Sequence, residues 1–162
     1  MFSKTIIIPE SDNERSGRRI ACRWVVVDDQ GQIPLIYDSY MWYYKLPGWW
    51  MEWQEDKIES FRREISEETW CEIDDIEELW KVIEENSKWR QVSYCFFWKI
   101  ISKWEKHFTQ KEIDRGYKLI WVKFEEALSL IENEQPRDEW GLVMKERESY
   151  ILWEIMKLKL GK

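Results

Sequence analysis

The stretch YKLPGWWMEWQEDKIESFRREISEETWCEI, residues 44–73, joins a Pro-Gly turn to a run of carboxylates and contains four tryptophans. In its second half, residues 56–69 carry Ile58, Phe61 and Ile65 at spacings of three and four, with good helix formers between them. This spacing predicts an amphipathic helix. We expect the apolar side of the helix to dock on a sheet.

The same helix presents Glu64, Glu67 and Glu68 within an arc of roughly 100° beside the apolar side. Carboxylates three or four residues apart repel each other by about 0.2–0.5 kcal/mol per pair, and a bound divalent cation would turn that repulsion into ligation. A solvated acidic face with Arg62 and Arg63 as partners explains the same charges. The order of strand, turn, acidic loop and helix favours the metal site, because a turn carbonyl could face the same cation.

The residues before this stretch predict three strands. Residues 19–29, RIACRWVVVDD, are rich in β-branched and apolar side chains and run into the turn cluster DDQGQ. Residues 33–37, IPLIY, are predicted to complete a hairpin with them. Residues 42–46, WYYKL, predict a third strand, which is closed by the Pro-Gly turn.

The residues after this stretch alternate between strand and helix patterns. Residues 76–85 fit either a helix or a strand, whereas residues 90–101 and 117–124 are dense in aromatic and β-branched side chains and predict strands. A second helix is predicted around residues 124–131 and a third over residues 142–159. The interleaving predicts an α/β/α sandwich with a mixed β-sheet flanked by helices. The apolar positions that mark the second helix are Phe124, Ala127, Leu128 and Ile131.

Length and charge restrict the class of protein. The chain has 162 residues and a mass of 20.2 kDa, which fits a single domain over residues 1–162, and no linker or internal repeat divides it. A net charge of -7 and a pI near 5.0 argue against a general DNA coat and against binding to an anionic membrane.

Cysteine and histidine usage restricts the chemistry further. Cys22, Cys71 and Cys95 form an odd set without C-x-x-C spacing, so neither a disulfide framework nor a zinc knuckle is predicted, and a cytoplasmic location is expected. Residues 1–10 hold an apolar run too short for a signal peptide. The single histidine, His107, excludes sites that need two or three histidine ligands.

Residues 49–71 resemble the signature of the Nudix hydrolase superfamily, G-x5-E-x7-R-E-U-x-E-E-x-G-U, where U is a bulky aliphatic residue. The resemblance implies a MutT-like α/β/α fold and a Nudix box over about residues 48–71. It also implies hydrolysis of a nucleoside diphosphate linked to another moiety, with Mg²⁺ or Mn²⁺ as cofactor. The matching positions are Glu55, Arg63, Glu64, Ile65, Glu67 and Glu68.

The resemblance assigns roles by position in the motif. Glu67 and Glu68 are expected to bind the metal, with the carbonyl oxygen of Gly48 as a further ligand. Glu64 is expected to be a ligand or the base that activates water. Arg63 is expected to orient the glutamates through charge-assisted hydrogen bonds. The first motif glutamate is expected to support the loop. A polyphosphate is repelled by such an acidic helix unless cations intervene, which makes the metal requirement physically reasonable.

Residues outside the motif are weaker candidates. Glu112 or Asp114, just before the strand predicted at 117–124, could complete the metal shell or act as base, although a solvated loop explains them better. Arg23 or Arg90 could hold a phosphate, and Tyr44 could stack on a base, although exposed strand arginines and sheet-core tyrosines are common. Nothing in the sequence selects among nucleoside triphosphates, oxidised triphosphates, ADP-ribose, nucleotide sugars and capped RNA ends.

Tryptophan stands where the Nudix signature has glycine. Trp49 takes the place of the first motif glycine, Trp50 that of a glycine that usually follows, and Trp70 that of the last motif glycine, while Cys71 replaces the final aliphatic residue. Trp70 follows the predicted helix at a position where a left-handed residue, normally glycine, ends the helix. A residue with a Cβ atom in that conformation costs about 1–2 kcal/mol.

Three interpretations of the tryptophans remain open. In the first, the tryptophans form a stacking platform for a base. In the second, they are ordinary core aromatics. In the third, their codons are UGA, which is read as tryptophan in one variant genetic code and as glycine in another. Thirteen tryptophans beside six glycines invert the usual composition, in which glycine is about 7% of residues. Under the third interpretation, glycine would also be encoded at further positions outside the box, namely Trp24, Trp42, Trp80, Trp89, Trp98, Trp104 and Trp153.

These interpretations lead to different functions. A chain with genuine tryptophans is expected to be a catalytically impaired Nudix-like module that binds nucleotides or a protein partner. A chain with glycines is expected to be an active hydrolase of a nucleotide-type small molecule, as a monomer or a homodimer. A calcium-binding structural domain is less favoured, because the sequence has no EF-hand loop spacing.

Overall fold

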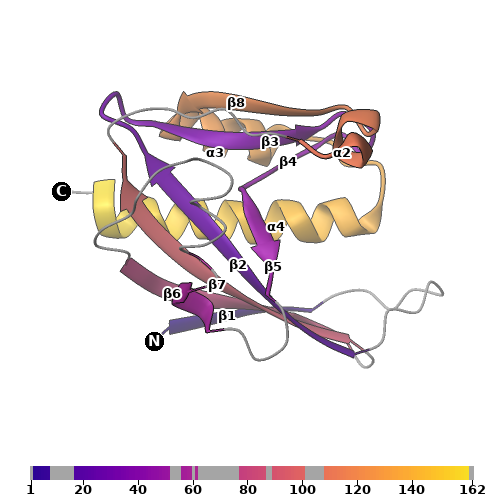
Figure 1. Ribbon diagram of the computed structural model, residues 1–162, viewed down its shortest axis with the longest axis horizontal. Helices are drawn as coiled ribbons and strands as arrows, with labels where there is room; N and C mark the ends of the chain where they lie inside the picture. The colour runs from indigo at the N-terminus through magenta and orange to yellow at the C-terminus, as the bar shows by residue number, and fades with distance from the viewer. Residues whose placement is uncertain are drawn as a thin grey trace.

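The computed structural model describes residues 2–7, 17–51, 56–59, 61, 77–86, 89–100 and 108–160. Its strands form two sheets (Figure 1). The five-stranded sheet has the order β1 (Phe2–Ile7), β6 (Glu77–Glu85), β7 (Trp89–Lys99), β2 (Gly17–Val27) and β5 (Gly48–Trp50). The three-stranded sheet has the order β4 (Tyr43–Lys45), β3 (Gln32–Asp38) and β8 (Tyr117–Lys123).

In the described part of the chain, three helices lie in the second half of the sequence. They are α2 (Gln110–Asp114), α3 (Phe124–Asn133) and α4 (Glu139–Ile155), the last of which continues as a π-helix over Met156–Leu160. Figure 1 shows the long α4 running behind β2 and β7, with α3 behind β3 and β8. No described helix is long and apolar enough to cross a membrane.

Residues 21–27 of strand β2 are buried on both sides of the sheet and divide the core into two layers. Val25 and Val27 belong to the core that includes α3 and α4, whereas Trp24 and Val26 belong to a second cluster with Phe61. This alternation follows from the period of two in a strand. Because β2 pairs with β7 in parallel and with β5 in antiparallel orientation, the sheet is mixed. The predicted α/β fold with a mixed sheet and flanking helices is therefore confirmed.

The predicted hairpin of residues 19–29 and 33–37 is wrong, although both strands and the turn between them exist. Strand β2 pairs with β5 and β7, and β3 pairs with β4 and β8 in the other sheet. The physical reason is a corner at Asp28, whose Oδ1 accepts hydrogen bonds from the backbone N–H groups of Gln30 (2.9 Å) and Gln32 (2.7 Å). The corner sends the chain from one sheet to the other.

The structure settles the ambiguous segments and moves some boundaries. The described part of residues 76–85, which fitted a helix or a strand, forms strand β6 over Glu77–Glu85, and β1 was not predicted. The third strand, predicted over residues 42–46, is limited to β4. Helix α4 begins three residues before the predicted 142–159 because Asp138 caps it, accepting from the backbone N–H of Gly141 at 2.8 Å.

Candidate functional site

Gly48 lies where the backbone of β5 comes very close to β2. It stands opposite Arg23 in the antiparallel pairing of the two strands. A Cβ atom on residue 48 would clash with the carbonyl oxygen of Cys22 and would lie 2.7 Å from Nη1 of Arg23. Only glycine allows this approach without moving a strand. The Pro-Gly turn is therefore held firmly beside β2.

The helix predicted at residues 56–69 begins as expected in its described part. Residues 57–59 and 61 are helical. Oδ1 of Asp56 accepts hydrogen bonds from the backbone N–H groups of Ile58 (2.9 Å) and Glu59 (3.1 Å), as an N-cap does. Phe61 is fully buried, and its ring centroid lies 4.6 Å from that of Phe96 on β7. The start of the helix thus docks on the sheet through the predicted apolar face.

Most of the predicted metal and catalytic residues lie outside the described residues. Within the described ranges, no three His, Cys, Asp or Glu side chains lie close enough to hold a metal ion. The turn glycine and the capped helix start are the described parts of the predicted box. The predicted residues outside the described ranges are Glu55, Arg63, Glu64, Glu67 and Glu68.

Arg23 is a buried cation beside the Gly48 turn. Its side chain is 8% exposed, its Nη1 donates to the carbonyl oxygen of Cys22 at 2.9 Å, and its Nε has no hydrogen-bond partner among the described residues. Burial, followed by the nearby guanidinium of Arg147, lowers the pKa of Arg23 to about 10. The guanidinium therefore stays charged at neutral pH, which suits it to hold a phosphate.

The indole of Trp50 lies against two arginines of β2. Its ring centroid is 5.1 Å from the guanidinium carbon of Arg19 and 5.8 Å from that of Arg23, and Trp50 is 49% exposed. These are cation–π contacts. Arg19 was not predicted as a site residue. Its signal was the spacing of four from Arg23, an even number that puts both side chains on one face of a strand.

Arg90 lies elsewhere on the same sheet. Its Nε pairs with Oε2 of Glu85 at 3.3 Å, and in the parallel register it stands opposite Arg18. Arg23 lies five positions after Arg18 along β2, a span of roughly 16 Å. The structure does not bring Arg90 together with Gly48.

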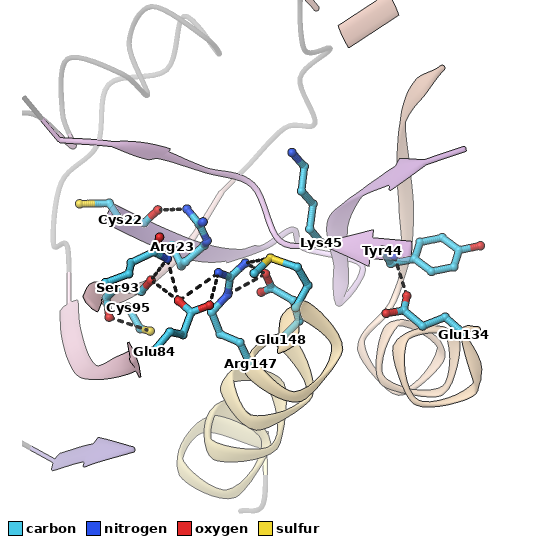
Figure 2. Close-up of polar contacts among 12 residues, drawn as sticks. Cys22, Arg23, Tyr44, Lys45, Glu84, Ser93, Cys95, Glu134, Arg147 and Glu148 are labelled. Carbon is cyan, nitrogen blue, oxygen red and sulfur yellow. Dashed lines mark hydrogen bonds and ion pairs between the residues drawn. The ribbon is translucent and has the colours of Figure 1, made fainter. Parts of the chain in front are cut away.

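Tyr44 lies on β4 in the second sheet. Its backbone N–H donates to Oε2 of the buried Glu134 at 2.6 Å, as Figure 2 shows. Its ring centroid lies 4.8 Å from that of Tyr37 on β3. Burial raises the pKa of the Glu134 carboxyl to about 7. These contacts give Tyr44 a packing role in its own sheet.

Glu112 caps a helix. Its Oε2 accepts hydrogen bonds from the backbone N–H and the hydroxyl of Thr109, both at 2.9 Å, and Thr109 Oγ1 accepts from the backbone N–H of Glu112 at 3.4 Å. This capping box begins α2. The segment had been predicted as a solvated loop or a metal ligand, although the pattern T-x-x-E was visible in the sequence.

Several tryptophans occupy positions that do not suit the side chain. Trp42 has φ +61°, and it is the only non-glycine residue with positive φ in the described part of the chain. The indole N–H groups of Trp80, Trp89 and Trp98 are buried and have no hydrogen-bond acceptor among the described residues. A buried donor without a partner costs about 1–3 kcal/mol. At Trp42 the positive φ favours the interpretation that glycine belongs there.

The sequence profile of the NUDIX domain matches residues 17–141. No curated protein sequence matches the chain significantly. Among solved structures, the MutT Nudix hydrolase from Burkholderia pseudomallei has a TM-score of 0.54 at 20% identity, covering 81% of this chain and 98% of that one. The MutT protein from Bacillus halodurans has a TM-score of 0.51 at 24% identity, with 69% and 72% covered.

A third solved structure shares the fold and was solved with a ligand. The NUDIX domain of NrtR from Shewanella oneidensis, in complex with ADP ribose, has a TM-score of 0.54 at 16% identity, covering 87% of this chain and 94% of that one. At these identities the likeness establishes the fold.

Proposed function

Because the chain belongs to the NUDIX domain family, we propose that it hydrolyses a phosphoanhydride bond in a nucleoside diphosphate linked to another moiety. The observation that carries this proposal is the Gly48 turn, pressed against β2 beside the charged Arg23. This turn, which leaves no room for a Cβ atom, lies beside a buried cation, and in the sequence a carboxylate-rich segment follows it. We propose one Nudix domain over residues 1–162.

The proposed cofactor is Mg²⁺ or Mn²⁺. Glu64, Glu67 and Glu68 would hold it together with the carbonyl oxygen of Gly48, a set of hard oxygen ligands that suits these cations. When bound, the metal offsets phosphate charge and acidifies or orients the attacking water. The close approach at Gly48 fits this arrangement, because a side chain at residue 48 would fill the space beside the turn. The capping role of Glu112 makes it the least supported ligand.

The chain's own residues would bind and orient the substrate. Arg23 would donate from its Nε to a phosphate oxygen, and Arg19, on the same face of β2, would contact the neighbouring phosphate. Arg63 would orient the glutamates, and Glu64 would bind metal or accept a proton from water. Glu55 would support the loop.

The proposed substrate is a nucleotide-type small molecule. A fold relative was solved with ADP ribose, which supports a nucleotide ligand for this chain. Nucleoside triphosphates, oxidised triphosphates, ADP-ribose and nucleotide sugars all contain the required bond. We propose a monomer or homodimer that acts without DNA or a membrane.

A second function is favoured by one observation. The indole of Trp50 lies against the guanidinium groups of Arg19 and Arg23, where it would compete with a bound phosphate. A chain that really carries tryptophan at this position would therefore be a catalytically impaired module that binds nucleotides or a protein partner.

A nucleotide panel tests both functions. Release of phosphate or pyrophosphate with Mg²⁺ would be measured for the chain as written and for a form with glycine in place of Trp42, Trp49, Trp50 and Trp70. We expect turnover by the glycine form and much weaker turnover by the tryptophan form. Glu67→Gln in the glycine form should lower turnover by on the order of a hundredfold or more, because a metal ligand is lost.

Two outcomes would contradict the proposal. Turnover that persists undiminished after Glu67→Gln would show that the hydrolytic site lies elsewhere. Absence of turnover in both forms would favour the binding module. UGG codons at Trp49, Trp50 and Trp70 would rule out the glycine interpretation independently of any assay.

A further inference from the structure

Three charged side chains are buried between the five-stranded sheet and α4. They are Glu84 on β6, 0% exposed, and Arg147 and Glu148 on α4, 1% and 0% exposed. Nη1 of Arg147 donates to Oε1 (3.0 Å) and Oε2 (3.2 Å) of Glu84, and its Nε donates to Oε1 of Glu148 at 3.1 Å. We call these residues the buried Glu-Arg-Glu cluster. Figure 2 shows it at the surface of α4 that faces the sheet.

Strand β7 extends the polar contacts of the cluster across the sheet. Nε2 of Gln91 donates to Oε2 of Glu84 at 2.7 Å and to Oγ of Ser93 at 3.0 Å. Ser93 and Cys95 follow Gln91 at intervals of two, so the three share one face of β7. Cys95 stands opposite Arg23 in the parallel register of β2 and β7. The face of β7 that contacts Glu84 through Gln91 therefore lies next to Arg23 through Cys95.

The cluster lacks one positive charge, and Arg23 is placed to supply it. Two carboxylates share the single guanidinium of Arg147, and the other buried arginine in the described part of the chain is Arg23. Oε2 of Glu148 and Nε of Arg23 are buried and have no hydrogen-bond partner among the described residues. Figure 2 shows Arg23 with its guanidinium turned toward the carbonyl oxygen of Cys22. Glu148 and Glu84 still act on Arg23 electrostatically, and both raise its pKa against the lowering by burial.

Stability alone is a weak reason for such a cluster. Removing charges from water is costly, and replacing a buried ion pair with packed apolar side chains is often neutral or stabilising. Apart from Gln91 and Ser93, which contact Glu84, the core between the sheet and α4 is apolar. A role in holding a functional group gives a better account of the buried charges.

We propose that the buried Glu-Arg-Glu cluster positions Arg23 for phosphate binding, with Glu148 as the positioning residue on α4. The carboxylates keep the guanidinium charged and hold it beside Gly48, so that the C-terminal helix controls the geometry at the Nudix box. This inference rests on the proposed function, in which Arg23 binds a substrate phosphate. Glu148 itself does not contact the substrate.

A double-mutant cycle in the glycine form tests the inference. Glu148→Gln keeps the shape and removes the charge, and Glu146→Gln, on the exposed side of the same helix, is the matched control. We expect Glu148→Gln to lower kcat/KM about tenfold, mainly by raising KM, as loss of a supporting contact typically does. Binding of Mg²⁺-tripolyphosphate, measured by calorimetry, should weaken by a similar factor, and Glu146→Gln should change neither quantity.

The decisive comparison is with Arg23→Lys. In the Arg23→Lys background, Glu148→Gln should have little further effect, because the residue that it positions is gone. The same tenfold loss in both backgrounds would overturn the inference, since it would show that Glu148 acts independently of Arg23. If Glu148 had a purely structural role, Glu148→Gln would lower the unfolding midpoint but would show no coupling to Arg23→Lys.

A second variant covers the case in which Glu148→Gln does not fold. The triple replacement Glu84→Leu, Arg147→Met and Glu148→Leu removes all three charges and keeps an apolar interior. We expect it to fold and to bind Mg²⁺-tripolyphosphate about tenfold more weakly. Unchanged binding would overturn the inference. If the glycine form turns over substrate but Glu148→Gln and Arg23→Lys show no coupling, this inference alone fails. If the glycine form without further substitutions shows neither turnover nor tripolyphosphate binding, the proposed function fails as well.

Discussion

Two residues show how closely the backbone near the candidate site selects for glycine. At Gly48 the reason is space, because a Cβ atom would meet β2. At Trp42 the reason is the backbone dihedral angle. Oδ1 of Asp38 accepts from the backbone N–H groups of Tyr40 and Met41, each at 3.1 Å, and the N–H of Trp42 donates to the carbonyl oxygen of Asp38 at 2.8 Å. This tight turn forces Trp42 into the left-handed region.

We expect Trp42→Gly to be more stable than Trp42→Ala by about 1–2 kcal/mol. Both variants lose the indole and its contact with the guanidinium of Arg137, 4.0 Å from the ring centroid, so that contact cancels in the comparison. Only the alanine variant keeps a Cβ atom at positive φ. The free energy of unfolding would be measured in urea. Equal stabilities would contradict the strain at this position.

At the scale of elements, α2 illustrates a residue with two possible roles. Glu112 lies before β8, where a metal ligand was predicted, and it also completes the capping box of α2 with Thr109. The two roles differ in what they require, because glutamine can cap a helix as glutamate does but is a poor ligand for Mg²⁺.

We expect Thr109→Ala to lower the free energy of unfolding by about 1 kcal/mol, through loss of the cap. Glu112→Gln should leave stability unchanged, and it should also leave metal-dependent turnover of the glycine form unchanged. Urea unfolding and the nucleotide assay check the two variants. A large loss of turnover in Glu112→Gln, at unchanged stability, would instead make Glu112 a metal ligand.

The junction of α3 with β4 provides a pH-dependent prediction. Burial raises the pKa of the Glu134 carboxyl from 4.5 to about 7, although the N–H of Tyr44 opposes the shift. Because the folded chain binds this proton more tightly than the unfolded chain, the stabilisation from Glu134 is complete below pH 4.5 and is lost as the pH rises to about 7.

The stability of the unaltered chain relative to Glu134→Gln should therefore fall between about pH 4.5 and pH 7. Urea unfolding at several pH values measures the difference, in which other titrating groups cancel. Glu125→Gln, on the exposed side of the same helix, is the control. A constant difference across this range would show that the carboxyl of Glu134 titrates alike in the folded and unfolded chains.

At the scale of the whole molecule, the sequence predicts local helices and strands, but it does not predict which strands pair with each other. The apolar spacing of Ile58 and Phe61 predicted the helix that begins after Asp56, and the β-branched and apolar residues of 19–29 predicted the strand that became β2. The partners of β2 were not predictable, because β7 is distant in sequence and the adjacent strand β3 looked like the natural hairpin partner.

The residues of the candidate site likewise divide into those that the sequence identified and those that it did not. Gly48 was found through a motif, and Arg23 was named only as one of two arginines that could hold a phosphate. Its neighbours Arg19 and Glu148 were missed, because a motif does not include residues that meet only in the folded chain. Arg147 and Glu148 looked like ordinary charged helix residues, since their burial depends on how α4 packs against the sheet.

The parallel pairing of β2 with β7 has a consequence for synthesis on the ribosome. Gly17 pairs with Trp89, 72 positions later, so β2 leaves the ribosome long before its main partner exists. At translation rates of about 5–20 residues per second, that wait lasts roughly 4–14 s. During this time a highly apolar strand edge has no native neighbour on that side. Nascent chains should therefore depend on chaperones until residue 99 has emerged, and slower translation should increase the fraction that aggregates.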